Sequence, residues 1–443
     1  MQPQAPWDSP AVHGKIYTIE YDLRTHLTPK GSPAIYDFLQ TAEQTADLLL
    51  HDFCSAAIRG HALYVLDGKA NSFVTMEANE TGTAAIWSAV GTALRTAGQF
   101  VPPAAQKEQR EDGSIGGGLP AEVAVFVDDV STAHWPVNLA GRSNKHMPPF
   151  HDLDWGSLNL GMVPETFGAL PFPVRHHYLS DILAPEFSAA AIKLAVLLNP
   201  VKVSAELAAA IKAKLQVGNK TVLYSVAAAA LDGDGAATFT DGARDLTGMQ
   251  GLALGTGSPL GRRTVFTDPG KDKPGWPAAA AAIWAPLVGS AAGTHWQATP
   301  WWWYNASQAG PDETGLVLGR YETTTRPSLV QVAFADHTSV FSANPALPAA
   351  AIQALAAAAG VHSYTPFVTP TTRVEAGGNM LVIHHAVAVF SGVIAAAGDE
   401  ACTVLLPRPA TVRFADNGSM VCSNCAQFVD CGIANHTRVY TVV

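Results

Sequence analysis

Charged side chains that could support acid–base or nucleophilic chemistry gather in one short stretch near the start of the sequence. Residues 15–28, KIYTIEYDLRTHLT, form an apolar run that carries Glu20 and Asp22 and opens into a polar turn with Arg24 and His26. A carboxylate placed in this way could act as a nucleophile or as a proton acceptor. The same four residues could instead form a structural ion cluster, with the carboxylates paired to Arg24 and His26. The stretch by itself leaves both interpretations open.

An apolar β-strand is the element that must position these residues. Ile16, Tyr17 and Ile19 favour extended structure, and the run ends where charge begins. This pattern is typical of a strand buried in a parallel sheet, whose carboxyl-terminal mouth holds the chemistry in α/β barrels. We therefore expect Glu20 to lie at such a mouth.

The following elements continue an alternation of helix and strand. A T-x-x-Q capping box beginning at Thr41 predicts a helix within residues 32–60, which end in a glycine. A second strand is predicted at 61–67 and again ends in an acid, Asp67, and a second helix is predicted at 82–98. Two β-α units in a row are consistent with part of a (β/α)₈ barrel.

A second α/β pattern begins after a linker. Residues 102–120 combine Pro, charge and a Gly triplet, and they predict a surface linker. Residues 121–370 alternate again, with a buried strand at 122–129, a short helix within 174–183 and a helix capped by Ser204. Strands and helices that alternate in this way predict a doubly wound, flavodoxin-like α/β domain.

Two stretches depart from that pattern. Residues 231–313 contain many Gly and Pro breakers and are predicted to be rich in loops. They include the tryptophans 301–303, for which core packing is favoured over a sugar-stacking platform, because neighbours on a strand point in opposite directions. Residues 371–443 show no helical pattern and predict the short strands of a small β-sandwich.

Composition limits the classes of function. The sequence has 443 residues, of which 48% are hydrophobic and 14% charged, as expected of a globular protein with an ample core. The net charge of −10, without a Lys/Arg cluster, argues against a nucleic-acid partner. The apolar runs are too short or too interrupted to span a bilayer, so no membrane partner is expected. No calcium loop or metal-binding histidine spacing is present, and no cofactor is expected.

The cysteines and glycosylation motifs leave the localisation open. Cys402, Cys422, Cys425 and Cys431 cluster near the end of the sequence, and disulfides are favoured over a zinc site because the C-x-x-C…C-x-x-C spacing is absent. Residues 1–12 lack the basic start and apolar core of a signal peptide. Sequons of the N-x-[ST] type, which are compatible with the secretory pathway, begin at Asn79, Asn219, Asn305, Asn417 and Asn435.

Several segments, taken in order, match those of one enzyme family. They are TIEYDLRTHL, TAEQTADLLLHDFCSAAIRGHALYVLD, AEVAVFVDD, YLSDIL, KLAVLLNPVKVSAELAAAIKAKL, DLTGM and VLLPRPATVRF. In these the sequence resembles the C-terminal part of the β-galactosidases of glycoside hydrolase family 42. The resemblance implies the last two units of a (β/α)₈ barrel in residues 1–101. It also implies a class I amidotransferase-like trimerisation domain in 121–370 and a small β-domain in 371–443.

The resemblance implies a retaining glycoside hydrolase that acts on β-linked sugars. Glu20 matches the nucleophile at the end of the seventh barrel strand, and Asp22, Arg24, His26 and Asp67 would contact the sugar. The general acid of the family lies on the fourth strand, which these residues do not match. We therefore expect a C-terminal fragment with an incomplete active site. Asp67 could equally cap the loop that follows it.

A non-catalytic alternative also stands. Class I amidotransferases need a cysteine at a strand-to-helix elbow, but the matching segment here reads LYSVAAAAL. This favours an assembly or wall module in residues 121–370. Together with the missing general acid, it allows a carbohydrate-binding or oligomerisation protein derived from such an enzyme. The family resemblance implies a homotrimer.

Overall fold

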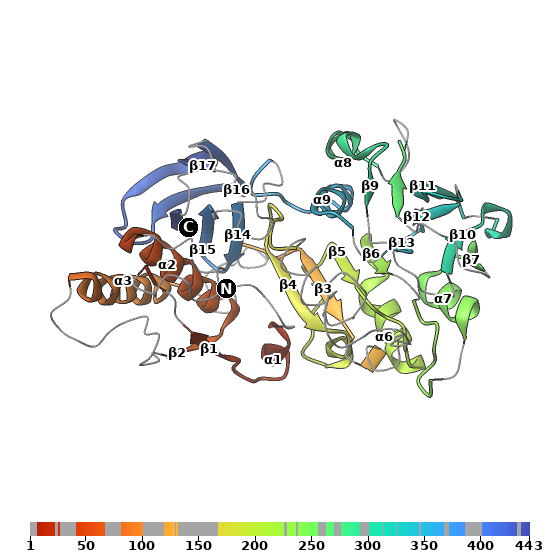
Figure 1. Ribbon diagram of the computed structural model, residues 1–443, viewed down its shortest axis with the longest axis horizontal. Coiled ribbons are helices and arrows are strands. Elements are labelled where there is room, and N and C mark those ends of the chain that lie inside the picture. The colour runs from red at the N-terminus through yellow and green to blue at the C-terminus, as the bar shows by residue number, and fades with distance from the viewer. Residues whose placement is uncertain are drawn as a thin grey trace, which may run out of the picture.

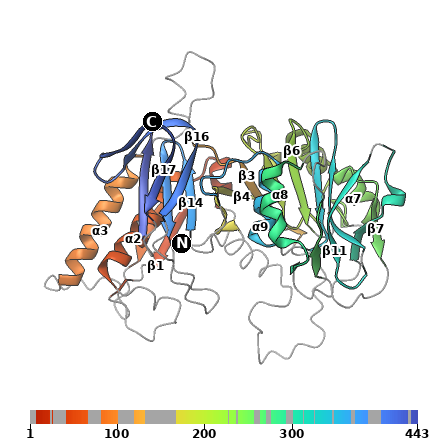
Figure 2. The same ribbon diagram turned by 90° about the horizontal axis from the view of Figure 1, so that it is seen from above.

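A computed structural model describes most of the chain, with gaps. The described ranges are 7–22, 25–26, 41–66, 81–100, 119–128, 130–131, 167–225, 228–235, 238–255, 263–269, 276–292, 301–311, 313–324, 326–344, 347–366, 372–385, 401–431 and 436–443. They form an elongated molecule with two halves (Figure 1). The first and last segments of the chain pack together in one half, and the residues between them form the other (Figure 2).

The N-terminal segment contains a β-α-β-α unit. Its elements are α1 (Ser9–Val12), β1 (Thr18–Asp22), α2 (Ala42–Arg59), β2 (Ala62–Leu66) and α3 (Thr81–Ala97). The side chain of Thr41 accepts the backbone N–H of Gln44, and the side chain of Gln44 accepts that of Thr41, which forms the capping box expected from the sequence. Gly60 ends α2 with a φ of 72°, a left-handed conformation that favours glycine.

β1 and β2 form a small parallel sheet. Thr18 lies opposite Ala62, and α2 is the connection that returns the chain to the start of β2. Leu49 and Phe53 of α2 pack against Ile86 of α3, so the two helices share a core. Among the described residues, neither strand has a second hydrogen-bonded neighbour.

The other half contains a nine-stranded sheet within the described residues. In spatial order its strands are β4 (Val174–Tyr178), β3 (Val123–Val127), β5 (Leu194–Leu197), β6 (Lys220–Ser225), β13 (His337–Ser342), β12 (Pro327–Ala333), β11 (Gly315–Tyr321), β8 (Thr264–Phe266) and β9 (Ala291–Ala292). The first five of these are parallel and the rest are antiparallel. Numbered along the chain, the five parallel strands have the order 2-1-3-4-5, as in flavodoxin-like sheets.

Helices cover both faces of this sheet, because its strands are apolar on both sides. Val123 and Val125 of β3 belong to the core beneath α8 (Ala278–Trp284) and α9 (Ala349–Ala358), which lie together in Figure 2. The intervening Phe126 belongs to the opposite core, beneath helices α6 (Ala205–Leu215) and α7 (Phe239–Thr247). Short 3₁₀ helices complete this half: η4 (Leu179–Leu183), η5 (Ala285–Leu287) and η6 (Ala306–Gln308).

The structure corrects the sequence prediction at two places in this half. The short helix predicted within residues 174–183 is the 3₁₀ helix η4, and the residues before it form strand β4, which was not predicted. Residues 231–313, predicted as loops, contain α7, α8 and an antiparallel pair of strands, β7 (Leu252–Gly255) and β10 (Trp301–Tyr304). Trp302 of β10 is buried, as expected for core packing, and Trp303 is half-buried beneath the guanidinium of Arg326.

A five-stranded antiparallel sheet packs on the N-terminal unit. In spatial order it contains β14 (Thr372–Gly377), β15 (Met380–His385), β18 (His436–Val442), β16 (Ala401–Phe414) and β17 (Met420–Cys431). The prediction of a sandwich differs from this single sheet, because β18 pairs with both β15 and β16 and so joins all the described strands. Met380 and Val382 of β15 pack against Cys54 and Ile58, so α2 covers one face (Figure 1).

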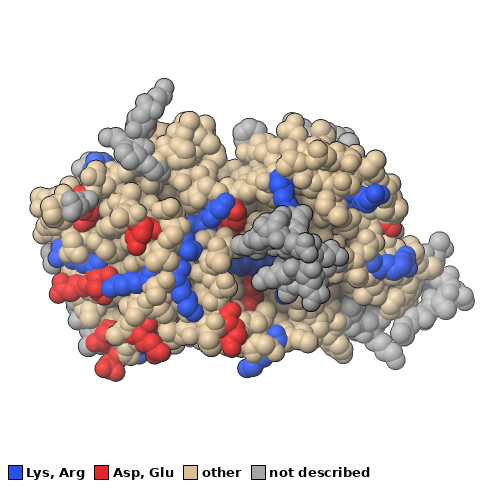
Figure 3. All heavy atoms as spheres, turned by 180° about the vertical axis from the view of Figure 1, so that it is seen from behind, with Lys and Arg blue, Asp and Glu red and all other residues tan. Residues whose placement is uncertain are grey.

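Charges of both signs are interspersed on the surface. On the face shown in Figure 3, acidic and basic side chains are mixed rather than separated into large fields. Ion pairs such as Lys212 with Asp245 and Lys193 with Glu122 contribute to this mixture. None of the helices in the described ranges is long and apolar enough to cross a membrane.

The predicted linker 102–120 is described only from Leu119, which is buried and donates its N–H to the carbonyl of Gly378 (2.7 Å).

Candidate active site

The carboxyl ends of β1 and β2 lie at the same edge of their parallel sheet. Glu20 is the third residue of β1 and lies opposite Tyr64, and Asp22 is its last residue and lies opposite Leu66. The backbones of Glu20 and Asp22 are described, but their side chains are not. Arg24 and Asp67 lie outside the described residues. The fold thus brings the end of β1 beside the end of β2, from which the segment with Asp67 departs.

His26 is half-buried and is anchored to the first turn of α2. Its backbone N–H donates to Oγ1 of Thr45 (2.9 Å), and its ring Nδ1 lies 3.1 Å from the same oxygen. Thr45 uses its one hydroxyl hydrogen to donate to the carbonyl of Thr41 (3.3 Å). We therefore assign the ring hydrogen of His26 to Nδ1, which leaves Nε2 as the acceptor of the ring.

The environment of His26 favours a neutral ring. Burial lowers its pKa, and the carboxylate of Glu43 opposes that effect only in part. A neutral imidazole whose Nε2 is an acceptor can receive a hydrogen bond from a hydroxyl group. This is a chemically suitable property for a residue expected to contact a sugar.

Exposed apolar side chains occur on several elements of the β-α-β-α unit. Ile16 is 74% exposed and precedes β1, and Tyr64 of β2 is 56% exposed. Trp87 and Leu94 of α3 are also exposed and lie seven positions apart, so they share one side of the helix. Parallel sheets and their helices are normally covered on both faces. The β-α-β-α unit therefore has an apolar surface that the described part of the chain leaves open.

Arg59, the last residue of α2, ties this unit to the rest of the molecule. Its Nη1 donates to Oδ2 of Asp8 (2.8 Å), and its Nη2 donates to Oε1 of Glu375 (2.9 Å) and to the carbonyl of Val174 (3.1 Å). Burial would lower the pKa of Arg59, but the carboxylates of Glu375 and Asp8 outweigh burial and raise it. The charged guanidinium therefore fixes α2 against β4 and β14. The sequence offered no signal for this contact.

Asp8 accepts hydrogen bonds from two further groups at the same junction. Nη1 of Arg175 donates to Oδ1 of Asp8 (3.0 Å), and the backbone N–H of His176 donates to Oδ2 (2.7 Å). Burial raises the pKa of Asp8, but the guanidinium groups of Arg59 and Arg175 outweigh it and hold the pKa well below its usual range. Burial also lowers the pKa of His176 to about 3, so its ring is neutral near neutral pH.

A second buried contact joins α2 to the C-terminal sheet. Nδ1 of His51 lies 2.9 Å from Oδ1 of Asp52, and the His51 ring lies 4.7 Å from the ring of His384. Nδ1 of His384 lies 2.7 Å from Oγ1 of Thr437, whose hydroxyl donates to the carbonyl of Asp47 (2.6 Å). Burial lowers the pKa of both histidines, so both rings are neutral near neutral pH.

The adjacent His385 belongs to a separate polar chain inside the sheet. Its Nδ1 lies 3.2 Å from Oγ1 of Thr372, and its Nε2 lies 3.2 Å from Oδ2 of Asp430. Tyr440 donates its hydroxyl to the other oxygen of Asp430 (2.8 Å). The order of hydroxyl, imidazole and carboxylate matches that of a nucleophile triad, but Thr372, His385 and Asp430 are all buried. We interpret this series of hydrogen bonds as structural.

One histidine of each adjacent pair, 176–177 and 384–385, lies near an aspartate. Oδ2 of Asp181 lies 3.4 Å from Nδ1 of His177, four positions earlier, and Asp430 contacts His385, although neither pair has an acidic residue at a metal-ligand spacing such as H-E-x-x-H. The first contact follows an i, i+4 spacing that the sequence displays, whereas the second joins distant strands. Among the described residues, no group of three or more His, Cys, Asp or Glu side chains could hold a metal ion.

The large sheet has its own potential ligand site, at the point between β3 and β5 where the strand order reverses. There Asp128 donates its N–H to Oδ1 of Asn199 (2.7 Å), and Nδ2 of Asn199 donates to the carbonyl of Asp128 (2.6 Å). Oδ2 of Asp128 accepts the backbone N–H of Ser131 (2.9 Å) and its hydroxyl. These buried groups bond to one another, which favours a structural role for this edge.

The cysteines and sequons are described in part. Cys422 and Cys425 form a disulfide, in agreement with the preference for disulfides over zinc. Ala401 pairs with Cys431 and Cys402 with Asp430, but the side chains of both cysteines lie outside the description. The sequon asparagines Asn219, Asn305 and Asn417 lie outside helices and strands. Asn79 and Asn435 fall outside the described residues.

Comparison with known proteins identifies the fold. No family model and no curated protein sequence matches this chain. A β-galactosidase structure from Rahnella sp. R3 is similar over 99% of this chain and 57% of that chain, at 11% identity and a TM-score of 0.62. A β-galactosidase structure from Bacillus circulans sp. alkalophilus is similar over 96% of this chain and 55% of that chain, at 13% identity and a TM-score of 0.56.

A GH42 β-galactosidase from G. stearothermophilus is similar over 90% of this chain and 51% of that chain, at 15% identity and a TM-score of 0.52. The fold of this chain therefore resembles that of GH42 β-galactosidases, as the sequence indicated. The chain spans slightly more than half the length of these solved structures. At such low identities the similarity shows the fold alone.

Proposed function

We propose that this chain forms part of a retaining glycoside hydrolase of the β-galactosidase type, with Glu20 as the nucleophile. The observation that carries the proposal is that Glu20 lies in β1, two residues before its carboxyl end at Asp22, in a parallel pair within a GH42-like fold. Active sites of α/β barrels lie at this end of the strands. The β-galactosidase activity of the similar structures indicates a carbohydrate substrate.

In a retaining mechanism, the carboxylate of Glu20 attacks the anomeric carbon and forms a glycosyl ester, which water then hydrolyses. A second carboxylic acid, about 5 Å away, protonates the leaving oxygen and later activates the water. We assign no residue of this chain to that role. Asp22, Arg24, His26 and Asp67 would bind sugar hydroxyl groups, and the neutral ring of His26 would contribute its Nε2 as an acceptor.

We further propose the division of the chain that the family resemblance implies. Residues 1–101 supply two units of a (β/α)₈ barrel, and 102–120 connect them to an amidotransferase-like α/β domain in 121–370. Residues 371–443 form the C-terminal β-domain. The exposed Tyr64 and Trp87 support an incomplete barrel, because further β-α units beside β1 and β2 would cover them.

The second candidate is a non-catalytic carbohydrate-binding or oligomerisation protein. It is supported by the hydrogen bonds between Asp128 and Asn199, which pair these buried polar groups with each other at the switch point of the large sheet. On this view a second and third copy of the chain, rather than further barrel units, cover the apolar surface near Trp87. Sedimentation would then show a trimer, and aryl β-galactosides would not be hydrolysed.

The proposed nucleophile can be tested without the general acid. A 2-deoxy-2-fluoro-β-galactoside with a dinitrophenolate leaving group needs no protonation to depart, so it can trap the glycosyl ester on the nucleophile alone. We expect peptide mass spectrometry to find the sugar on Glu20 in the native chain and nowhere in a Glu20→Gln variant. An ester on a different carboxylate would refute the assignment of Glu20. A trimer that neither forms the ester nor hydrolyses aryl galactosides would favour the second candidate.

A further inference from the structure

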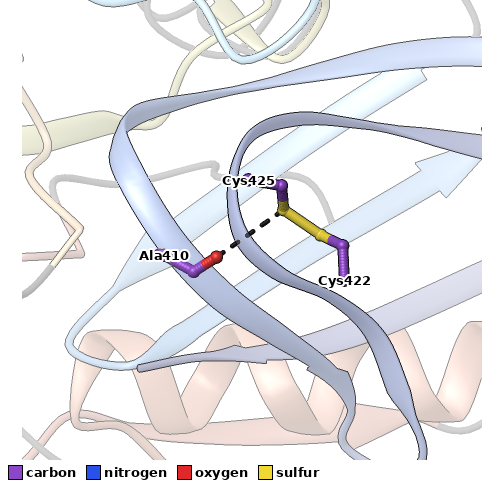
Figure 4. The surroundings of a disulfide bond; sticks show 3 residues. All are labelled: Ala410, Cys422 and Cys425. Carbon is purple, nitrogen blue, oxygen red and sulfur yellow. Dashed lines mark hydrogen bonds between the residues drawn. A yellow bond between two sulfur atoms is a disulfide. The ribbon is translucent and has the colours of Figure 1, made fainter.

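The disulfide between Cys422 and Cys425 lies in the edge strand of the C-terminal sheet. β17 is the last strand in the order of that sheet and pairs with β16 alone among the described residues. The two cysteines are half-buried, and Ser423 and Asn424 between them are exposed. The pair thus lies between the main core, against which both cysteines pack, and the exposed turn of the strand (Figure 4).

The disulfide spans an irregularity in the strand. Ala410 of β16 pairs with Cys425, and Val412 pairs with Cys422, so two steps along β16 correspond to three along β17. The extra residue makes a β-bulge, in which Asn424 has a φ of 51°. The left-handed region is uncommon for residues other than glycine, although asparagine tolerates it better than most. The covalent bond thus closes the loop that contains the bulge.

The carbonyl of Ala410 offers a partner for the reduced form of the site. Its oxygen lies 3.6 Å from Sγ of Cys425, within hydrogen-bond distance for sulfur (Figure 4). A disulfide sulfur carries no hydrogen to donate, but a thiol does. Reduction would therefore give Cys425 a hydrogen-bond acceptor that is already in place.

Exposure and bonding both distinguish this pair from the remaining described cysteine. Cys54 is free and fully buried in α2, and burial raises its pKa to about 12. Its thiolate is therefore scarce near neutral pH, and reagents cannot reach it. Cys422 and Cys425, in contrast, are only half-buried and lie in an edge strand, and disulfides that solvent can reach are the ones that exchange with thiols in solution.

We propose that Cys422 and Cys425 form a reversible thiol–disulfide exchange site that responds to low-molecular-weight thiols. The thiolate of such a thiol attacks the sulfur of Cys422, a mixed disulfide forms, and the Cys425 sulfur departs with the bonding electrons and takes up a proton. A second thiol attacks the mixed disulfide and releases Cys422. The protein disulfide gains two electrons and two protons, and the two thiols become one small disulfide.

The expected structural effect of reduction is local. Opening the bridge frees the bulge and loosens the pairing of β17 with β16. The interior of the sheet is held independently, because Val404 and Phe428 of the same two strands are buried in the main core. The sheet should therefore stay folded while its edge becomes more mobile. This proposal does not depend on the glycoside hydrolase activity.

The test is thiol mapping of the native 443-residue chain in glutathione buffers. After alkylation with iodoacetamide, cleavage before Asp416 and Asp430 yields the peptide 416–429, which contains Cys422 and Cys425 and no other cysteine. We expect this peptide to pass from unlabelled to doubly labelled in one two-electron transition. Cys54 should react more than about a hundredfold more slowly unless denaturant is added.

Hydrogen exchange supplies an independent readout of the same transition. Reduction should speed exchange in residues 401–431 and leave α2 unchanged, and a Cys422→Ser/Cys425→Ser double variant should show the fast exchange in either buffer. The proposal is overturned if peptide 416–429 becomes labelled only together with Cys54, because reduction would then require global unfolding. It is also overturned if the peptide is fully labelled even in oxidised glutathione, because no disulfide would then exist to exchange.

Discussion

The guanidinium of Arg59 and the carboxylate of Glu375 lie 2.9 Å apart, although 316 positions separate them in the sequence. The contact joins the end of α2, the helix between β1 and β2, to strand β14 of the C-terminal sheet. The same guanidinium contacts Asp8, so one side chain connects three distant segments. The orientation of the strand pair that carries Glu20 therefore depends on residues at both ends of the sequence.

Removal of this arginine should destabilise the protein strongly. Arg59→Ala should lower the free energy of unfolding by about 3–5 kcal/mol, because it leaves Asp8 and Glu375 without their shared partner. Arg59→Lys should lower the free energy of unfolding by less, since lysine retains the charge but not the forked geometry of the guanidinium. Urea denaturation measures the free energy of unfolding of both variants. Arg263, which pairs with Glu322 at the surface, provides the control, and Arg263→Ala should have little effect. Equal effects at both sites would contradict the assigned role.

The junction should also be sensitive to added volume at Gly377. A Cβ atom there would lie 2.8 Å from Cγ2 of Ile58 and 3.3 Å from Nη2 of Arg175. Gly377→Ala should therefore lower the free energy of unfolding by about 1–3 kcal/mol. Gly310→Ala is the matched control, because its Cβ would have no neighbour closer than 3.8 Å. A thermal shift as small as that of the control would show that α2 and the sheet can move apart without loss.

Acid should weaken the contact between α2 and the C-terminal sheet. Burial lowers the pKa of His51 and His384 in the folded protein, so the unfolded chain binds protons more readily than the folded one. The stabilisation is complete above the unfolded pKa of about 6.5 and is lost as the pH falls below it, by up to about 1.4 kcal/mol per pH unit for each histidine.

Urea denaturation between pH 7 and pH 5 measures this dependence. A His384→Gln variant keeps a polar group near Thr437 but cannot be protonated, so its stability should depend less steeply on pH. His337, which is paired with the exposed Asp336, is the control, and His337→Gln should retain the slope of the parent protein. An unchanged slope in His384→Gln would contradict the assignment of the effect to this contact.

The anchoring of His26 can be tested at Thr45. Thr45→Val removes the oxygen that accepts the backbone N–H and the ring Nδ1–H of His26, and it should destabilise the protein by about 1–3 kcal/mol. Thr45→Ser retains the hydroxyl and should change little. Nitrogen NMR of labelled histidine should report the Nδ1–H form in the parent and in Thr45→Ser, and a mixture in Thr45→Val. The Nε2–H form in the parent would disprove our assignment.

Local signals in the sequence predicted local structure well. The capping box of Thr41 and Gln44 marks the start of α2 and the glycine at position 60 marks its end. Each signal involves only neighbouring residues, so both are visible in the sequence and are confirmed. Ser204 likewise caps α6. The alternation of strands and helices indicated the α/β architecture. The resemblance to GH42 β-galactosidases rested on particular segments such as TIEYDLRTHL and AEVAVFVDD, and the solved structures confirm it for the fold.

Features that depend on distant partners could not be predicted. β4 was missed because the segment VRHHY is polar, and its contacts with Asp8, from the side chain of Arg175 and the backbone N–H of His176, span 167 and 168 positions. The helix α7 was missed because it contains Gly242, where a side chain would collide with the carbonyl of Ala229. For the candidate site, the parallel pairing of the strands follows from the β-α-β pattern. The assignments of Glu20, Asp22, Arg24, His26 and Asp67 remain predictions.

The central place of β18 in its sheet determines the order in which this half of the molecule can be assembled during synthesis. β14 and β15 form one hairpin and β16 and β17 another, and in the described residues they are joined through β18 alone, which is translated after all four. Until then α2 has no complete surface to pack on. Asp47 of α2, for example, is synthesised 390 positions before its partner Thr437. The N-terminal unit must therefore persist on the ribosome with an apolar face uncovered, a period in which chaperones would act.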